Sequence, residues 1–351
     1  MLEGMPRKTL SISALAGAAA LVLAGCAPAG SPGPSGSEAA DDAVLQVVAS
    51  TNVYGDIAAA IGGDRVAVTS IIDSIAQDPH SYEASARDQL TVSEADLIIE
   101  NGGGYDSFVD ALVDATGTDA PVITAVEFSH DWPENEGHDE DDDPSTGSGT
   151  EDGHDHESED DHDRESEDDH EGHDHVEGFN EHVWYDPHTI AHVAEEIAHE
   201  LAELDPAGAE AYESGYEQFA AGIEELEASL GDIDAAHAGE QVFVTEPVPL
   251  YLTAAAGLEN VTPDAFSEAV EEGQDVPAAT LLEALDILKS GTVRTVIANA
   301  QTGGAETTAA IDAAKDAGIP VLEFTELVPD GETYLGWMRQ NIADLAGTLT
   351  R

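Results

Sequence analysis

An acidic, histidine-studded stretch between Trp132 and Pro187 carries the most distinctive chemistry of this sequence. From Glu134 to Glu177 nearly every residue is Asp, Glu, His, Gly or Ser, and the tetrapeptide GHDH occurs twice. No apolar period there could bury a face, so we expect residues 134–177 to form no packed core. Imidazole nitrogens and carboxylate oxygens are the side-chain groups that bind borderline divalent cations. The pattern therefore indicates an insertion that captures such cations.

The histidines of this insertion are the candidate ligands for weak cation capture. They are His138, His154, His156, His162, His170, His173 and His175. The alternative is a solvated acidic linker, which is what a run of charge usually is. So many histidines are unusual in a mere spacer, and their density favours contact with metal ions.

Four further residues lie where a parallel sheet usually holds its ligands. In open parallel sheets, ligands bind beyond the carboxyl ends of the strands. Two candidates come from the first half of the chain and two from the second, as a site in a cleft between two lobes would require. The four are His80 in DPH, His182 in NEHVWYDP, Glu246 at the end of QVFVTE, and Glu326 after VLEF.

Alternating β-branched runs and helical windows must position these residues. Strands are expected within 44–50, 65–72, 96–102 and 121–126, and again within 241–246, 293–299 and 321–324. Runs of apolar residues that alternate with helices favour parallel sheets covered on both faces. We therefore predict an α/β fold of two lobes, each a parallel sheet covered by helices, with a metal cleft between the lobes.

A long helix is expected to join the two lobes. It runs from about Ala209 to Leu230, because Tyr212, Phe219 and Leu226 belong to one apolar stripe at helical spacing. Such a helix would be a rigid strut. The predicted organisation is an N-terminal lobe in two parts (44–133 and 178–205), the insertion (134–177), the linker helix (206–238) and a C-terminal lobe (239–351).

The start of the chain has the features of a secretory signal with a lipidation site. Arg7 and Lys8 precede an apolar run from Leu10 to Leu23, which is short for a membrane span. The run closes in LAGC, which resembles the lipobox of bacterial lipoproteins, with Cys26 as the lipidated residue. We expect a signal peptide at 1–25 and a flexible tether at 26–43 that reaches about 20–25 Å. The alternative is an ordinary secretory signal with a stray cysteine.

Composition restricts the partners of this chain. Its 351 residues are enough for two domains, and 74 acidic against 10 basic residues give a formal charge of -64. Such a charge excludes a general affinity for nucleic acid or anionic membranes and favours cations. Cys26 is the only cysteine, so neither an internal disulfide nor a thiolate metal site can form.

Several motifs together carry a resemblance to a known family. They are DPH at 78–80, ADL at 95–97 with glycines at 102–104, HVW at 182–184 before the step Asp186-Pro187, and Glu326 followed by Tyr334 and Asn341. Over nearly the whole mature chain, the sequence resembles the zinc and manganese solute-binding lipoproteins of ABC importers, the ZnuA-like and TroA-like group. Zinc members of that group often carry a His- and Asp-rich loop before the second ligand, as this chain does.

The resemblance implies a metal site formed by His80, His182, Glu246 and Glu326. Zinc members usually have histidine where this chain has Glu246, as manganese members do, and the last carboxylate is usually aspartate. Zn²⁺ accepts two imidazoles and two carboxylates in tetrahedral form, whereas Mn²⁺ prefers them when the carboxylates bind bidentate. Glu268 and Glu323 are rival carboxylates.

The histidines also have simpler explanations. Next to Pro79, His80 could sit in an ordinary turn, and His182 could pack on Trp184 with its hydrogen bonds satisfied. His188, His192 and His199 fall at helical spacing. A pair at i, i+4 could chelate a metal, although such a stripe is more often a solvated helix face.

The expected function is that of a lipid-anchored, extracytoplasmic receptor. It would capture Zn²⁺, or alternatively Mn²⁺, and deliver it to an ABC permease and its ATPase. We expect a monomer that contacts the membrane only through its lipid anchor and binds no nucleic acid. The alternatives are a surface adhesin or zinc buffer, and a secreted zinc hydrolase. HExxH and GxSxG are absent, which argues against an enzyme.

Overall fold

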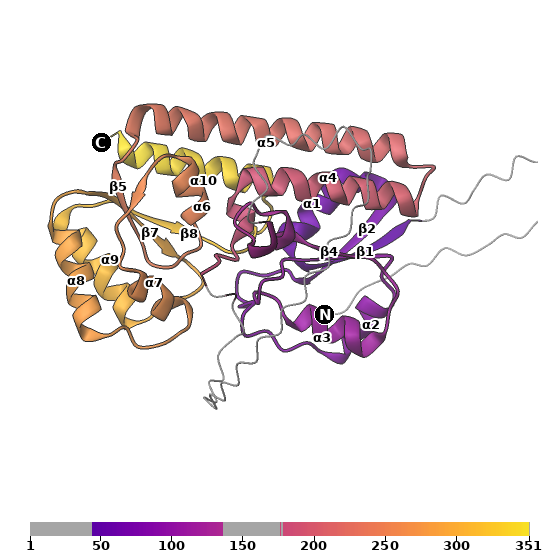
Figure 1. Ribbon diagram of the computed structural model, residues 1–351, viewed down its shortest axis with the longest axis horizontal. Helices are drawn as coiled ribbons and strands as arrows, with labels where there is room; N and C mark the ends of the chain where they lie inside the picture. The colour runs from indigo at the N-terminus through magenta and orange to yellow at the C-terminus, as the bar shows by residue number, and fades with distance from the viewer. Residues whose placement is uncertain (1–43, 136–175, 177, 351) are drawn as a thin grey trace, which may run out of the picture. The chain divides into compact units, whose positions relative to one another are not determined.

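A computed structural model describes residues 44–135, 176 and 178–350 of the chain (Figure 1). The predicted signal peptide, the tether with Cys26, and the insertion histidines from His138 to His175 lie outside the described residues. Among the helices that are described, none is both long enough and apolar enough to cross a membrane.

The first sheet is parallel and has helices on both faces. Its strands, in the order β2-β1-β3-β4, are β2 (Val66–Ile72), β1 (Leu45–Thr51), β3 (Leu97–Glu100) and β4 (Val122–Thr124). Val47 of β1 packs in a core that includes residues of α1 (Asn52–Gly62). Its neighbour Val48 packs with α2 (Ala86–Ser93) and α3 (Phe108–Thr116) instead. Because successive side chains of a strand point to opposite faces, both faces of this sheet are covered.

The second sheet repeats this arrangement. Its strands, in the order β6-β5-β7-β8, are β6 (Glu259–Asn260), β5 (Gln241–Val244), β7 (Val293–Asn299) and β8 (Val321–Phe324), all parallel. The helices of this half are α6 (Leu250–Ala255), α7 (Asp264–Glu271), α8 (Ala278–Lys289), α9 (Ala305–Ala317) and α10 (Tyr334–Leu349). Phe243 of β5 packs against α7, whereas its neighbours Val242 and Val244 belong to the other core.

Two long helices connect the sheets. α4 (Pro187–Leu204) begins at a proline, and the carboxylate of the preceding Asp186 accepts the His188 backbone N–H at 3.1 Å. α5 (Ala209–His237) packs against α4, α1 and α10 (Figure 1). The sequence predicts an apolar stripe to about Leu230 within a linker segment at 206–238; buried Ile233 extends the stripe, and the helix continues to His237.

Hydrogen bonds join the two halves of the chain. The Asn52 side-chain amide donates to the Val328 carbonyl at 2.8 Å and accepts the Val328 N–H at 3.0 Å. The Tyr185 hydroxyl donates to the Thr325 carbonyl at 2.7 Å, and the Tyr334 hydroxyl donates to the Trp184 carbonyl at 2.8 Å. The predicted fold of two helix-covered parallel sheets is confirmed. β6 and α7 are elements that the sequence analysis did not predict.

Candidate metal site

His80 lies in a turn between β2 and α2. The Asp78 carboxylate accepts the His80 N–H at 3.0 Å and the Ser81 hydroxyl at 2.8 Å, which closes the turn. The half-buried His80 ring packs edge-on against Tyr105, with ring centroids 4.8 Å apart. His80 therefore does sit in an ordinary turn, as its position next to Pro79 suggests. The same turn presents the imidazole toward His182.

His182 lies at the start of a short 3₁₀ helix, Val183–Tyr185, and is 1% exposed. Its Nδ1 lies 2.8 Å from Asn180 Oδ1. An amide oxygen can only accept, so Nδ1 carries the hydrogen and Nε2 keeps the lone pair that a metal ion needs. The His182 ring also contacts Trp184 at a centroid distance of 5.1 Å. Packing on Trp184 and a ligand role are therefore compatible.

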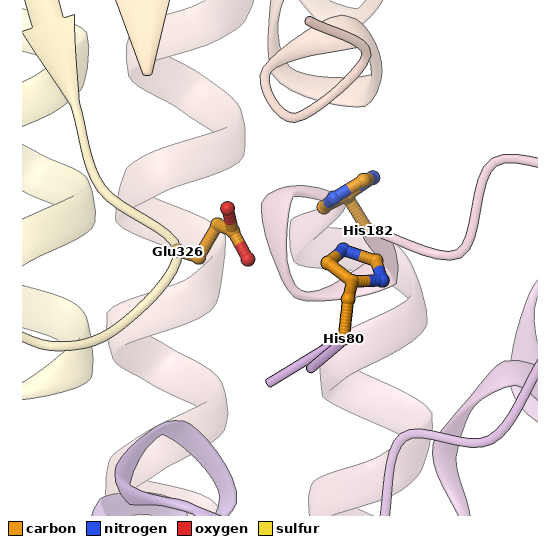
Figure 2. A group of neighbouring side chains, drawn as sticks. All are labelled: His80, His182 and Glu326. Carbon is orange, nitrogen blue, oxygen red and sulfur yellow. The ribbon is translucent and has the colours of Figure 1, made fainter. Parts of the chain in front are cut away.

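Glu326 approaches these histidines from the loop after β8, and it is 1% exposed. The Tyr105 hydroxyl donates to its Oε2 at 3.1 Å. One ligand atom from each of His80, His182 and Glu326 lies within 4.8 Å of the other two (Figure 2). In Figure 2 the carboxylate faces the two imidazoles across the space between them.

A turn after β3 places Tyr105 for this contact. Gly102 there has φ 78°, and a Cβ at this position would lie 2.4 Å from Thr124 Cγ2. Only glycine fits such a turn without strain or displacement. The buried Asp106 carboxylate accepts the backbone N–H groups of Asn101 at 2.7 Å and Gly102 at 2.8 Å. The glycine turn noted in the sequence therefore supports a residue that contacts the candidate site.

Glu246, after β5, is joined to Glu326 through Asn299, the last residue of β7. The Asn299 amide nitrogen donates to Glu246 Oε2 at 2.8 Å and to Glu326 Oε1 at 2.6 Å. The Gln301 N–H donates to Asn299 Oδ1 at 3.0 Å, which fixes the orientation of the amide. Glu246 Oε1 is buried and has no hydrogen-bond partner among the described residues. Glu246 is thus adjacent to the three-residue cluster of Figure 2 without belonging to it.

Burial makes these carboxyl groups hard to ionise. It raises the pKa of Glu326 to about 7, with a further contribution from Glu246, while the hydrogen bond from Asn299 opposes the rise. Burial also raises the pKa of Glu246. Within the described part of the chain, no lysine or arginine forms an ion pair with either residue. The missing positive charge could be supplied by a bound cation.

Two carboxylates near the histidines were not predicted from the sequence. Glu271, the last residue of α7, has Oε1 at 3.7 Å from His182 Nε2. Burial raises its pKa to about 9, and Glu181, Glu246 and Glu326 add to the rise. Glu181 is 3% exposed, and together with His80 and Glu271 it forms a second group of closely spaced ligand atoms. Glu181 directly precedes His182, so this position could have been examined from the sequence.

The rival candidates lie elsewhere. Glu268 on α7 and Glu323 on β8 are exposed. His188, His192 and His199 are exposed on α4, and the rings of His188 and His192 lie 4.9 Å apart. His199 Nδ1 and Nε2 lie 3.8 Å and 3.6 Å from Glu196 and Glu203. The structure brings His80, His182 and Glu326 together, and leaves these other residues on solvated surfaces.

Fold and site together define a class: a two-lobed α/β protein in which nitrogen and oxygen atoms of His80, His182 and Glu326, the candidate metal ligands, lie close together. The sequence model of the family described as "ZnuA: Zinc-uptake complex component A periplasmic" matches residues 47–348. The chain belongs to this family.

Comparison with individual proteins agrees with this assignment. The manganese-binding lipoprotein MntA of Halalkalibacterium halodurans is 36% identical over 104 residues, 30% of this chain and 32% of that protein. The manganese ABC transporter substrate-binding lipoprotein PsaA of Streptococcus pneumoniae is 36% identical over 112 residues, 30% of this chain and 34% of that protein. The matches thus span about a third of the length of these relatives.

The solved structures support the fold. The periplasmic zinc-binding protein TroA from Treponema pallidum superposes with a TM-score of 0.65 at 17% identity, over 88% of this chain and 99% of that one. At this level of identity the likeness establishes the fold alone.

Proposed function

We propose that this protein is an extracytoplasmic receptor that captures a divalent transition metal and delivers it to an ABC permease and its ATPase. The observation that carries the proposal is the convergence of His80, His182 and Glu326, of which His182 and Glu326 are buried and His80 is half-buried. The names of the relatives MntA and PsaA, a metal-binding lipoprotein and a substrate-binding lipoprotein of an ABC transporter, support it. The proposed function is binding and release, without covalent chemistry.

The proposal includes the placement of the protein at the membrane. Residues 1–25 serve as a signal peptide, and Cys26 carries the lipid that holds the receptor to the cell membrane. Residues 26–43 are the tether, and residues 134–177 are a separate, weaker store of metal ions. The receptor works as a monomer, and release follows separation of the two lobes by the permease.

The proposed cargo is Zn²⁺, held by His80, His182 and Glu326, with Glu246, which is linked to Glu326 through Asn299, as the fourth ligand. Two imidazoles favour zinc over manganese, and Zn²⁺ forms tetrahedral sites with nitrogen and oxygen ligands. The family description, which names zinc uptake, agrees with this choice.

Mn²⁺ is the second candidate, and two observations favour it. Both ligands from the second half of the chain are carboxylates, which are hard oxygen donors that can bind bidentate. In addition, the relatives MntA and PsaA are named for manganese.

Metal analysis of protein purified without added metal, followed by competition between Zn²⁺ and Mn²⁺, tests the cargo. We expect bound zinc, and zinc that displaces manganese. Since the Irving–Williams order favours Zn²⁺ at almost any such site, co-purified metal is the more telling result. Manganese in the purified protein would favour the second candidate.

Calorimetric titration of the full chain and of a variant without residues 134–177 tests where the tight site lies. We expect one tight site in both proteins and the loss of several weak sites in the deletion variant, because the sequence of residues 134–177 predicts no packed core, and ligands of that kind lose chain entropy on binding. Loss of the tight site together with the insertion would contradict the assignment to His80, His182 and Glu326.

A further inference from the structure

We infer that a second cation position, formed by His80, Glu181 and Glu271, lies beside the proposed metal site. A metal ion binds at this second position before it moves into the proposed metal site. This inference rests on the proposed function, since it supplies the route to that site. The cluster of His80, His182 and Glu326 is called the inner position here, and the cluster of His80, Glu181 and Glu271 the outer position.

The outer position has the spacing of a metal site. One ligand atom from each of its three residues lies within 4.8 Å of the other two. Glu181 is 3% exposed, and the Glu271 side chain is 13% exposed. Glu271 Oε1 is buried and accepts no hydrogen bond from any described residue, although it faces His182 Nε2 at 3.7 Å. A buried carboxylate oxygen in this setting is strongly stabilised by a cation.

The outer position opens to a pocket of about 480 Å³ beside α7. Glu181 and Glu271 line the pocket, and so do the carboxylates of Asp264, Glu268 and Glu272. Its lining contains no lysine or arginine among the described residues. A cleft lined by charge of one sign concentrates counter-ions and raises their association rate. The pocket therefore fits a hydrated divalent cation.

The two positions share His80, and this allows the ion to move without losing all its protein ligands. On moving inward, the ion exchanges the oxygens of Glu181 and Glu271 for His182 Nε2 and the Glu326 carboxylate. The short distance between Glu271 Oε1 and His182 Nε2 makes the exchange stepwise. The outer position offers two hard oxygens and one nitrogen, a set that suits a divalent metal ion that has kept some of its water.

Stopped-flow measurement of Zn²⁺ association with the full chain tests this route. The ring of Trp184, one of three tryptophans in the chain, lies 5.1 Å from that of His182, so its emission is expected to change when the inner position fills. We expect Glu271→Gln, and the double variant with Glu181→Gln, to slow association about tenfold or more. Dissociation should slow as well, so the equilibrium constant changes much less than either rate.

Glu268→Gln is the matched control, because it makes the same substitution on the same helix and in the same pocket without touching the outer position. We expect its association rate to stay within about twofold of wild type. Equal slowing in Glu268→Gln would overturn the proposal in favour of general steering by charge. Faster dissociation of Glu271→Gln with unchanged association would also overturn it and make Glu271 an inner ligand. If the wild-type chain bound no Zn²⁺ tightly, the proposed function itself would be wrong.

Discussion

The two halves of the candidate site differ in their chemistry and in how they are held. The first half of the chain provides imidazoles, each positioned by a residue two places away: Asp78 bonds the backbone of His80, and Asn180 bonds the ring of His182. The second half provides carboxylates that depend on distant partners. Asn299 is 53 residues from Glu246 and 27 from Glu326.

This difference shows that the nitrogen ligands are oriented by local turns, whereas the oxygen ligands are oriented only once the second sheet has formed. Among the described residues, no lysine or arginine forms an ion pair with these carboxylates. We expect changes in the two halves to affect metal binding differently, and the following predictions test this.

Loss of one imidazole should have the largest effect. His182→Ala removes a buried ligand whose tautomer is already set by Asn180. We expect Zn²⁺ affinity to fall more than about 100-fold, beyond the 10–100-fold typical of groups that only orient a ligand. Competition with a chelator of known affinity measures it. His188→Ala, an exposed histidine six residues further on, should bind like wild type. If the two variants bound Zn²⁺ with equal affinity, His182 would not be a ligand.

Replacing either of the two orienting amides with alanine should have a smaller effect. The two variants should distinguish the nitrogen half of the site from the oxygen half. Asn180→Ala frees the His182 ring, and Asn299→Ala removes the donor shared by Glu246 and Glu326. Each change should cost about 10–100-fold in affinity. Because Zn²⁺ depends more on nitrogen and Mn²⁺ on oxygen, Asn180→Ala should weaken zinc more and Asn299→Ala should weaken manganese more.

Titration of both amide variants with both metals, at fixed pH, measures these affinities. Equal losses for the two metals in both variants would mean that the halves of the site act as one unit. In that case the division into a nitrogen half and an oxygen half would have no consequence for metal choice.

The same difference explains what could be read from the sequence. The strands are apolar runs bounded by turns, so their existence follows from local pattern. The order of both sheets, with the second strand at one edge, depends on pairing between distant segments and was observed only in the structure. The segments around His80 and His182 carry local motifs, and these residues do lie together.

The remaining contacts of the site had no local signal. Asn299 is a polar residue at the end of a strand, and nothing in the sequence around it marks it as part of the site. Its two carboxylate partners come from other loops. Glu271 is one acid among 74 acidic residues, and it reaches His182 only because the unpredicted helix α7 packs next to the segment around residue 181. Contacts of this kind arise from tertiary packing, which spacing along one chain does not encode.

The smallest predicted effect is the part of the pH dependence of affinity that one carboxyl group, Glu326, contributes. In the metal-free protein, burial raises the pKa of Glu326 to about 7. Below that pH the carboxyl group holds a proton that a metal ion must displace, and imidazoles ordinarily bind protons below about pH 6.5. Zn²⁺ affinity should therefore fall as pH falls below 7, by about tenfold per pH unit for each ligand that loses a proton.

Calorimetry at pH 6.5 in two buffers of different ionisation enthalpy counts the protons released per Zn²⁺. Glu326→Gln should release fewer protons than wild type, because its amide cannot titrate, and its affinity should depend less steeply on pH. Glu323→Gln, which alters an exposed acid on β8, should match wild type. If affinity stayed constant from pH 8 to pH 6, the ligands would already be deprotonated in the metal-free protein, and burial would not govern the oxygen half.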